Sequence, residues 1–191
     1  MNAGEGGTQA LVPSRRPVPR YRGHSGAVLP VHWRDDIRVA VRTHLSEFVA
    51  VQCRTDLGAA RVDVASEVLS GFVDGGKCVR STFMYLGWLC GAGRDEAALR
   101  ASASLELFHA FALMQDDVMD ESALRRGRPA AHVLFSRWHR ERALTGASGR
   151  FGESAAVLLG DLCLVWASKM LRESGIGADA LARVWPRYDD M

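Results

Sequence analysis

The sequence predicts an all-α fold. From residue 32 onward, apolar residues recur at intervals of three and four positions, the spacing that gathers them on one face of an α-helix. Alternation of apolar and polar residues bounded by turn signals, which would indicate β-strands, is absent. No repeat of roughly 20–50 residues is evident either, so a solenoid or a propeller is not expected. The chain should therefore form a bundle of helices.

The ends of the expected helices follow from capping residues and glycine breaks. Asp35 or Asp36 is placed to cap the first helix, and Asp95 is placed to cap the long central one. Glycines should end the second and third helices, while the last helix should still be running where the sequence stops. The expected helices span approximately residues 36–49, 60–74, 77–90, 99–120, 129–144, 151–171 and 179–191.

Size and composition are those of an ordinary globular domain. The 191 residues are 48% apolar and 24% charged, which allows one sizeable core. The net charge of +2 gives no support for nucleic-acid binding. The four cysteines share no CxxC spacing and indicate free thiols in a reducing compartment. Because no signal leader and no uncharged apolar run of about 18 residues is visible, we expect no membrane span and a cytoplasmic protein.

Two regions are expected along the chain. Residues 1–30 are rich in proline, glycine and arginine and carry no amphipathic pattern, which is typical of a disordered, mildly basic tail. Such a tail is either a plain solvated leader or an anchor to an acidic surface. Residues 31–191 are expected to form the helical domain.

Three aspartates gather at the end of the central helix. Asp116 and Asp120 should stand one above the other, with Asp117 beside them. Like charges about 5–6 Å apart repel by roughly 3 kcal/mol per pair at an effective dielectric near 20, and the helix dipole disfavours anions at this end. A cation between the carboxylates would remove that cost, and all-oxygen ligation together with a phosphate favours Mg²⁺ over Ca²⁺. The alternative is a solvated acidic helix end.

A glycine-rich loop with two cations joins the second and third helices. Its sequence, GGKCVR at residues 75–80, lets the backbone turn tightly and lets a ligand come close. Lys77 and Arg80 are expected on one face of the first turn of the next helix, where they add to the positive end of its dipole. Lys77 is also one of only two lysines beside 22 arginines. We interpret the loop as an anion site; the alternative is a helix break followed by two surface charges.

Other polar residues fall close to these two clusters. His109 lies seven residues before Asp116 and is either a satisfied core histidine or a ligand contact. Arg125 and Arg126 precede a glycine and a proline, which is typical of a helix stop, yet two guanidiniums there would also bind phosphate oxygens bidentately. Asp161 interrupts an apolar run and should meet a partner or a polar cavity. Together these residues indicate a site for a metal-bound diphosphate attached to an apolar chain.

Four motifs occur in order along the chain: GGKCVR at 75–80, DDVMD at 116–120, RRGRP at 125–129 and FGESAAVLLGDL at 151–162. With this order and spacing, residues 36–191 resemble the trans-isoprenyl diphosphate (polyprenyl) synthase family, and most of all bacterial geranylgeranyl diphosphate synthases. The resemblance implies an isoprenoid-synthase-type helical bundle that condenses isopentenyl diphosphate with an allylic prenyl diphosphate in a Mg²⁺-dependent reaction. It implies geranylgeranyl diphosphate as the product, with farnesyl diphosphate next, and a homodimer.

The resemblance also implies a role for each matching residue of the reaction centre. Asp116 and Asp120 would coordinate Mg²⁺, with Asp117 in support. Arg125 would contact the allylic diphosphate, and Asp161 would lie near the reacting atoms. The residues implied to hold the diphosphate of isopentenyl diphosphate are Lys77, Arg80, His109 and Arg126.

In the family that the chain resembles, product length depends on the helix turns just before the first aspartate. Here Ala112 lies four residues before Asp116, Phe111 lies five before it, and Phe108 lies a further turn back. The small Ala112 would leave room beyond a C10 product, while Phe111 and Phe108 would form a floor. This arrangement implies a C20 product.

The chain departs from the family pattern in three places. Cys78 and Ser81 stand where the family usually has Arg and Pro, which implies weaker support of the loop. The family also continues with a Gly-Gln helix, a Lys-Thr pair and a second aspartate-rich motif that this sequence lacks, so we expect a C-terminally truncated, N-terminal part of a synthase with little turnover by itself. Two other classes stay open: a non-catalytic subunit that modulates a full synthase, and a class I terpene cyclase, which has no second diphosphate to hold.

Overall fold

The described part of the chain is almost entirely helical, which confirms the predicted all-α class. The computed structural model describes residues 32–58, 63–74 and 76–191, and the expected tail over residues 1–30 lies outside them. The elements in order are α1 (Trp33–Gln52), a π-helical turn η1 (Cys53–Leu57), α2 (Asp63–Asp74), α3 (Val79–Leu89), α4 (Glu96–Met119), β1 (Leu124–Arg125), β2 (Arg128–Pro129), α5 (Ala131–Glu141), α6 (Ser148–Arg172) and α7 (Ala178–Asp189).

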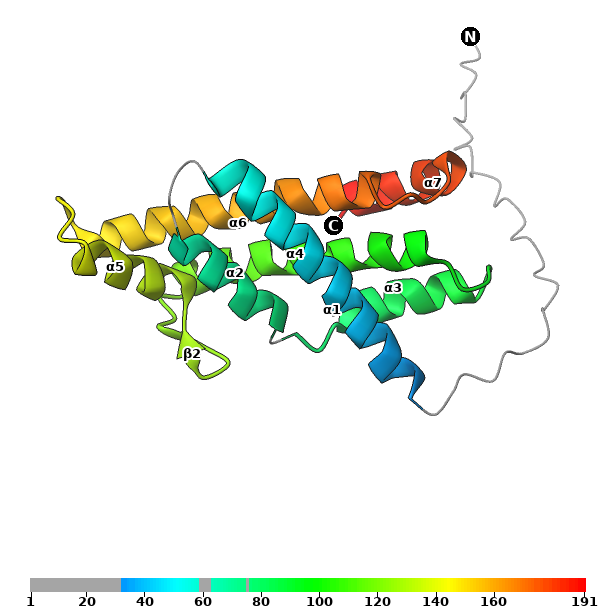
Figure 1. Cartoon of the computed structure of the whole chain (residues 1–191), viewed down its shortest axis with the longest axis horizontal. Coiled ribbons are helices and arrows are strands. Elements are labelled where there is room, and N and C mark those ends of the chain that lie inside the picture. The colour runs from blue at the N-terminus through cyan, green and yellow to red at the C-terminus, as the bar shows by residue number, and fades with distance from the viewer. Residues whose placement is uncertain (1–31, 59–62, 75) are drawn as a thin grey trace, which may run out of the picture.

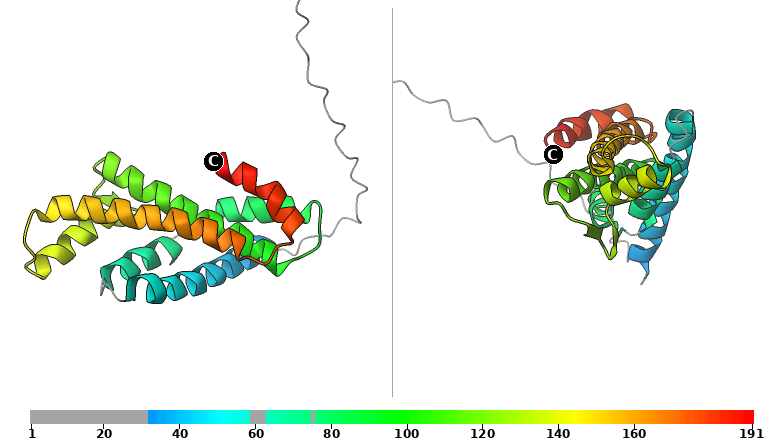
Figure 2. Two further views of the ribbon diagram at one scale, coloured as in Figure 1. Left: turned by 90° about the horizontal axis from the view of Figure 1, so that it is seen from above. Right: turned by 90° about the vertical axis from the view of Figure 1, so that its left-hand side faces the viewer.

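Two long helices, α4 and α6, lie side by side along the long axis of the molecule (Figure 1). α5 packs against α6 at one end, and α3 packs against α4. α1 crosses this layer diagonally and contacts α2, α3 and α4 (Figure 1). α7 turns back after α6, so that the C-terminus lies near the middle of the molecule rather than at its tip (Figure 2). This arrangement makes α4 the helix around which the others are packed.

The N-terminal half of α4 is buried on several sides, which explains its composition. Residues 101–104 have the small side chains Ala, Ser, Ala and Ser, and all four are at most 2% exposed. Small side chains let neighbouring helices approach the backbone closely. The hydroxyls of Ser102 and Ser104 each donate a 2.7 Å hydrogen bond to a carbonyl oxygen one turn back, so neither is left unsatisfied in the core.

Gly152 determines how closely α5 and α6 approach each other. A Cβ atom at this position would overlap the carbonyl oxygen of His132 and would lie 3.0 Å from the backbone nitrogen of Ser136. Backbone atoms cannot swing away as a flexible side chain can. The close contact between α5 and α6 therefore depends on glycine at position 152.

The helix ends agree with the sequence-based predictions at some places and differ at others. Asp95 caps α4, since its Oδ1 accepts a 3.0 Å hydrogen bond from the backbone nitrogen of Ala98, as predicted. The prediction that Asp35 or Asp36 caps α1 was wrong: His32 is the N-cap, and both aspartates lie in the first turn. Their negative charge still complements the helix dipole there. α7 ends at Asp189, just before the chain does.

The segment RRGRP does not end a helix, contrary to expectation. α4 ends earlier, at Met119, and residues 124–129 form a hairpin in which Leu124 pairs with Pro129 and Arg125 pairs with Arg128. The turn residues Arg126 and Gly127 have φ angles of 53° and 74°. Two successive positive φ angles are what a two-residue hairpin turn requires, and glycine supplies the second one without strain.

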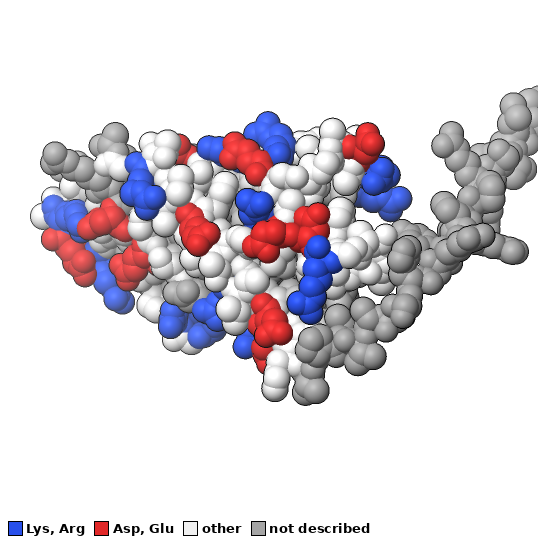
Figure 3. Space-filling model, turned by 45° about the vertical axis from the view of Figure 1, so that its right-hand side comes forward, with Lys and Arg blue, Asp and Glu red and all other residues white. Residues whose placement is uncertain are grey.

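α6 is long and apolar enough, by length and composition alone, to cross a membrane, and no other helix in the described ranges meets this test. It packs along α4 and α5, and central helices of globular proteins commonly meet the same criterion. On the face shown in Figure 3, acidic and basic side chains are interspersed rather than gathered by sign. This distribution agrees with the small net charge of +2.

Candidate functional site

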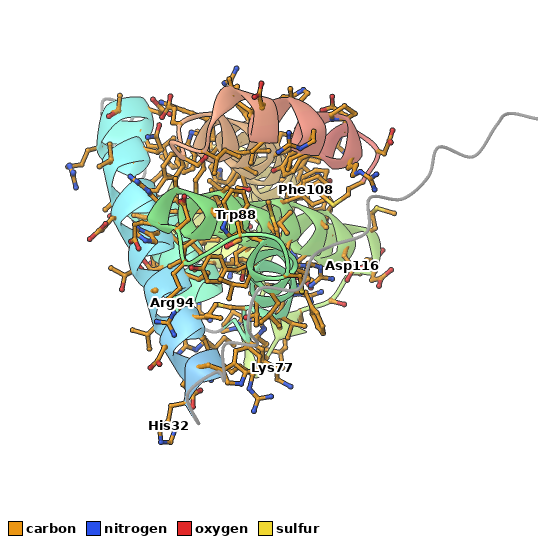
Figure 4. All side chains as sticks on the ribbon, turned by 90° about the vertical axis from the view of Figure 1, so that its right-hand side faces the viewer. His32, Lys77, Trp88, Arg94, Phe108 and Asp116 are labelled. Atoms are coloured by element: carbon orange, nitrogen blue, oxygen red, sulfur yellow. The ribbon has the colours of Figure 1, made fainter. Side chains whose placement is uncertain are left out.

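The three aspartates at the end of α4 lie in different environments. Asp116 and Asp120 are exposed, and Figure 4 shows Asp116 at the edge of the molecule, away from α1. Asp117 is only 1% exposed, because each residue of a helix is rotated by about 100° from the one before. The sequence-based expectation that Asp116 and Asp120 share a face fits this pattern. Two carboxylates therefore stay accessible at the negative end of the dipole of α4.

Arg125, on the hairpin, binds two of these aspartates at once. Its Nε atom lies 2.8 Å from each carboxylate oxygen of Asp117, and its Nη2 atom lies 2.9 Å from Oδ2 of Asp116. The hydrogen bond to the buried Asp117 is the main reason why the pKa of Arg125 is raised, and Asp116 raises it further. The guanidinium is thus fixed in orientation and permanently charged.

This ion pair corrects one step of the sequence-based argument. A bound cation was the favoured explanation of how the repulsion between the aspartates is relieved, but the guanidinium of Arg125 already offsets the charges of Asp116 and Asp117. Repulsion by itself therefore does not demand a metal. Asp120 has no ion pair with any side chain in the described part of the chain, so an uncompensated carboxylate remains beside Asp116.

The acidic end of α4 fits Mg²⁺ only when the ion is shared with another ligand. Within residues 32–58, 63–74 and 76–191, no group of three or more His, Cys, Asp or Glu side chains is placed to hold a metal ion. Asp116 and Asp120 offer two exposed carboxylates one turn apart. Mg²⁺ is commonly bound by one or two carboxylates plus water and substrate phosphates. The donor set therefore fits a metal–phosphate complex and does not fit an all-protein cage.

The loop before α3 differs in detail from the expected anion site. Lys77 is exposed in the loop itself, one residue before the N-cap Cys78, and not in the first turn of the helix as predicted (Figure 4). Arg80 is exposed in that first turn. Cys78 is buried and has φ 50°, a left-handed conformation that is costly for a residue with a side chain. The loop is therefore held in an unusual shape by its surroundings.

His109 is influenced by positive charge from the first turn of α3 and from the hairpin. Burial lowers the pKa of its ring, and the positive charge of Arg80 lowers it further, with smaller contributions from Arg126 and Arg125. Glu106 acts in the opposite direction. A histidine whose pKa lies below its ordinary value is neutral at pH 7. The charges of three arginines that are up to 46 positions apart in the sequence, from Arg80 to Arg126, thus act on one imidazole.

A cavity of about 770 Å³ borders the hairpin on the side of α2 and α5. Arg126 and Arg128 line it and form no ion pair with another described side chain. Arg125 lines it as well, so this residue faces both the aspartates and the cavity. The remaining walls are mostly apolar and include Val68 and Phe72 of α2. The cavity has the size and the lining that a phosphate-bearing small molecule needs.

Glu106 is a residue of this region that the sequence analysis missed. Its Oε1 atom accepts a 2.7 Å hydrogen bond from the hydroxyl of Ser81. Glu106 stands three residues before His109 in an apolar helix, and an acidic residue in such a pattern could have indicated a polar contact. The sequence could not identify that contact, because nothing in it indicates that the partner, Ser81, is 25 positions away.

Asp161 is exposed on α6 and lies opposite the acidic end of α4. Its Oδ1 atom accepts a 3.1 Å hydrogen bond from the side-chain nitrogen of Gln115. At the preceding residue, Gly160, a Cβ would be in ordinary contact with Met114 at 3.5 Å, so α6 and α4 lie close together at this point. Asp161 therefore has the polar partner that was expected, and this partner, Gln115, directly precedes Asp116 in the sequence.

The residues expected to limit product length form an aromatic group with α7. The ring of Phe108 lies 6.0 Å from that of Phe111 and 5.7 Å from that of Tyr188, both in edge contacts. Figure 4 shows Phe108 between α4 and α7. Ala112 is exposed one turn before Asp116. Tyr188 also belongs to this aromatic group, and the sequence analysis did not identify it. Its ring reaches Phe108 only because α7 folds back toward α4.

Comparison with known proteins adds independent support for the motifs. The family model described as polyprenyl synthetase matches residues 62–186. A geranylgeranyl diphosphate synthase from Saccharolobus solfataricus is 33% identical over 108 residues, covering 56% of this chain and 28% of that protein. A nonaprenyl diphosphate synthase from Mycobacterium tuberculosis is 34% identical, covering 63% and 32%, and a probable farnesyl diphosphate synthase from Bradyrhizobium diazoefficiens is 32% identical, covering 73% and 36%.

A solved structure shares the fold as well as the sequence pattern. It is a geranylgeranyl pyrophosphate synthase from Corynebacterium glutamicum, complexed with isoprenyl diphosphate and magnesium. The two chains superpose with a TM-score of 0.72 at 38% identity, over 78% of this chain and 44% of that one. Across these comparisons the chain spans between 28% and 44% of the length of the proteins that it matches.

Proposed function

Since the chain belongs to the polyprenyl synthetase family, we propose that it takes part in a Mg²⁺-dependent prenyl transfer, in which isopentenyl diphosphate condenses with an allylic prenyl diphosphate. The observation that carries the proposal is the position of Arg125. Its guanidinium binds Asp116 and Asp117, and the same residue lines the cavity together with Arg126. Two diphosphate sites, one acidic and metal-dependent and one cationic, would thus lie next to each other.

The allylic diphosphate is assigned to the acidic end of α4. Asp116 and Asp120 would hold it through Mg²⁺, which when bound supplies Lewis-acid stabilisation of the leaving diphosphate. Asp117 would keep the guanidinium of Arg125 in place, because both oxygens of its buried carboxylate accept from Nε. The hydrogen bonds of Arg125 use Nε and Nη2, which leaves Nη1 for a phosphate oxygen.

The diphosphate of isopentenyl diphosphate is assigned to the cationic side. Arg80 and Arg126 would bind its oxygens, with Lys77 closing over it from the loop. His109 is neutral at pH 7, because burial and the neighbouring arginines lower its pKa, so it would contribute a hydrogen bond and no charge. The apolar walls of the region would exclude water from the allylic cation that forms when the C–O bond breaks.

Geranylgeranyl diphosphate is the proposed product, and farnesyl diphosphate is the alternative. A prenyl chain that starts at Asp116 and runs back along α4 passes the exposed Ala112 before it meets Phe111 and Phe108. Eight residues of helix, from Phe108 to Asp116, correspond to about 12 Å. The edge contact between Phe108 and Tyr188 supports a floor at that depth.

Binding is the first test, because we expect these 191 residues to show little turnover by themselves. Isothermal calorimetry would measure the binding of farnesyl diphosphate with and without Mg²⁺. We expect binding that requires Mg²⁺ and that weakens at least about tenfold in the Asp116→Asn and Asp120→Asn variants, since each removes one metal-binding charge. Glu153→Gln, an exposed carboxylate elsewhere on α6, serves as the matched control and should bind like the unaltered chain. Equal affinity with and without Mg²⁺ would contradict the proposal.

Product analysis separates the remaining possibilities. The protein would be incubated with Mg²⁺, isopentenyl diphosphate and an allylic diphosphate, and released lipids would be identified by mass spectrometry. A C20 diphosphate supports the proposed product, and a C15 diphosphate supports the farnesyl alternative. Metal-dependent binding without any product would favour a non-catalytic subunit, and a cyclic hydrocarbon would overturn the proposal in favour of a terpene cyclase.

A further inference from the structure

We propose that Glu106 is a positioning residue, whose carboxylate holds the loop at residues 76–81 in the shape that binds a diphosphate. The inference rests on the proposed function and concerns a residue that none of the four sequence motifs contains. Glu106 lies on α4, and residues 76–81 run from the loop into the first turn of α3, so the contact joins two helices. The loop carries Lys77 and Arg80, the two cations assigned to isopentenyl diphosphate.

The carboxylate of Glu106 replaces the missing cap of α3. The N-cap residue of α3, Cys78, makes no side-chain capping hydrogen bond. The first backbone N–H groups of a helix have no partner within the helix and need an acceptor. Glu106 Oε1 accepts from the backbone nitrogen of Ser81, the third residue of α3, at 3.4 Å, and from the Ser81 hydroxyl at 2.7 Å. A negative charge at this end of the helix also complements its dipole.

The second oxygen of the same carboxylate lies near Gly76, at the start of the loop. A Cβ atom at Gly76 would lie 3.6 Å from Glu106 Oε2, which is ordinary contact. Burial raises the pKa of the Cys78 thiol to about 11, and the negative charge of Glu106 contributes to this increase. Glu106 therefore contacts Ser81 at one end of the turn in which Cys78 adopts its left-handed conformation, and it lies near Gly76 at the other end. Residues held in such conformations persist only when their surroundings fix them.

Glu106 is placed under the loop and is not a ligand of the anion. Lys77 and Arg80 are exposed, whereas Ser81 is fully buried, so the cations and the carboxylate lie on different sides of the loop. A carboxylate near an anion site lowers anion affinity through charge alone. Its presence there is understandable if the fixed loop geometry contributes more to binding than the charge removes.

These two effects have opposite signs, which makes the proposal testable. If Glu106 acted only through its charge, Glu106→Ala would bind isopentenyl diphosphate more tightly. If it positions the loop, the same variant should bind at least about tenfold more weakly in calorimetry. Glu106→Gln keeps an acceptor oxygen for Ser81 and should recover affinity to within about threefold of the unaltered chain. Equal or tighter binding by Glu106→Ala would overturn the proposal. Glu153→Ala, which removes an exposed carboxylate of α6, is the control and should bind like the unaltered chain.

Hydrogen exchange tests the same contact without a ligand. The amide of Ser81 should exchange at least about tenfold faster in Glu106→Ala, while the amides of α6 keep their rates, which also shows that the variant is folded. Ser81→Ala removes the hydroxyl but keeps the amide, and should give a smaller increase at residues 79–82. Unchanged exchange in Glu106→Ala would overturn the proposal. If the unaltered chain binds no isopentenyl diphosphate, the proposed function fails, while the exchange rates still decide whether Glu106 holds the loop.

Discussion

The Nε atom of Arg125 lies 2.8 Å from both carboxylate oxygens of Asp117, a residue that is only 1% exposed. This ion pair fastens the hairpin formed by β1 and β2 to the C-terminal end of α4. It explains why the hairpin has a defined position although it contains only two residues in each strand. The same contact orients Arg125 toward Asp116, so one pair stabilises the fold and shapes the candidate site.

Replacement of Asp117 by Asn should destabilise the protein. The change removes the buried partner of the Arg125 guanidinium and leaves it only the exposed Asp116, and losing one member of a largely buried pair costs up to about 3 kcal/mol. Urea unfolding followed by circular dichroism would measure the free energy of unfolding. Arg128→Ala, on the same hairpin but exposed, is the control and should change it by less than about 0.5 kcal/mol. A stability of Asp117→Asn equal to that of the control would show that the pair is not stabilising.

Gly152→Ala should weaken the packing of α5 against α6. The added methyl group meets the backbone at His132 and Ser136, so the helices must move apart, at a cost of about 2 kcal/mol or more. Gly87→Ala in α3 is the matched control, since nothing lies within 4 Å of its Cβ position. It should leave stability unchanged or raise it by about 0.5–1 kcal/mol, because alanine favours a helix. Thermal unfolding would measure the melting temperatures of both variants. Melting temperatures lowered to the same extent in both would contradict the role assigned to Gly152.

Stability should fall in acid partly through Asp63. A hydrogen bond from the indole of Trp138 and the charge of Arg142 lower the pKa of Asp63 below its usual 3.8. A carboxyl whose pKa is lower in the folded state contributes stability that is present above the unfolded-state pKa and is lost as pH falls through the folded-state value. As the pH falls from about 5 to about 3, the free energy of unfolding of Asp63→Asn should therefore decline less than that of the unaltered chain. Asp179→Asn, an exposed aspartate of α7, should follow the unaltered chain.

The four cysteines should react with thiol reagents at very different rates. Burial raises the pKa of Cys163 to about 12 and that of Cys78 to about 11, so both thiols stay protonated at pH 8 and are also inaccessible. Cys90 is exposed and Cys53 is half-buried. Labelling of the native protein should show one fast thiol that Cys90→Ser removes. Rapid labelling of Cys163 in the folded state would contradict the packing described for α6.

Much of the fold was predictable because it depends on local pattern. The spacing of apolar residues predicted the helices, and Asp95 capped α4 as its position before the helix suggested. The hairpin at residues 124–129 was missed because RRGRP satisfies the composition of a helix stop as well as that of a tight turn. Only the early end of α4, at Met119, distinguishes the two. The π-helical turn after α1 gave no sequence signal that we can identify.

The candidate site divides in the same way. Asp116 and Asp120 share an exposed helix face because they are four residues apart, a consequence of helix geometry that the sequence already contains. The pairing of Arg125 with Asp117 and the capping of α3 by Glu106 join residues on different elements.

By itself, the sequence determined the helical class, the family and the chemical types of the site residues, since these follow from short-range periodicity and from motifs. Tertiary structure alone decided which aspartate is buried, which charges act on His109 and which side chain bonds to the start of α3. The physical reason is that helical periodicity acts over three to four residues, whereas these contacts depend on how α3, α4 and the hairpin pack against one another.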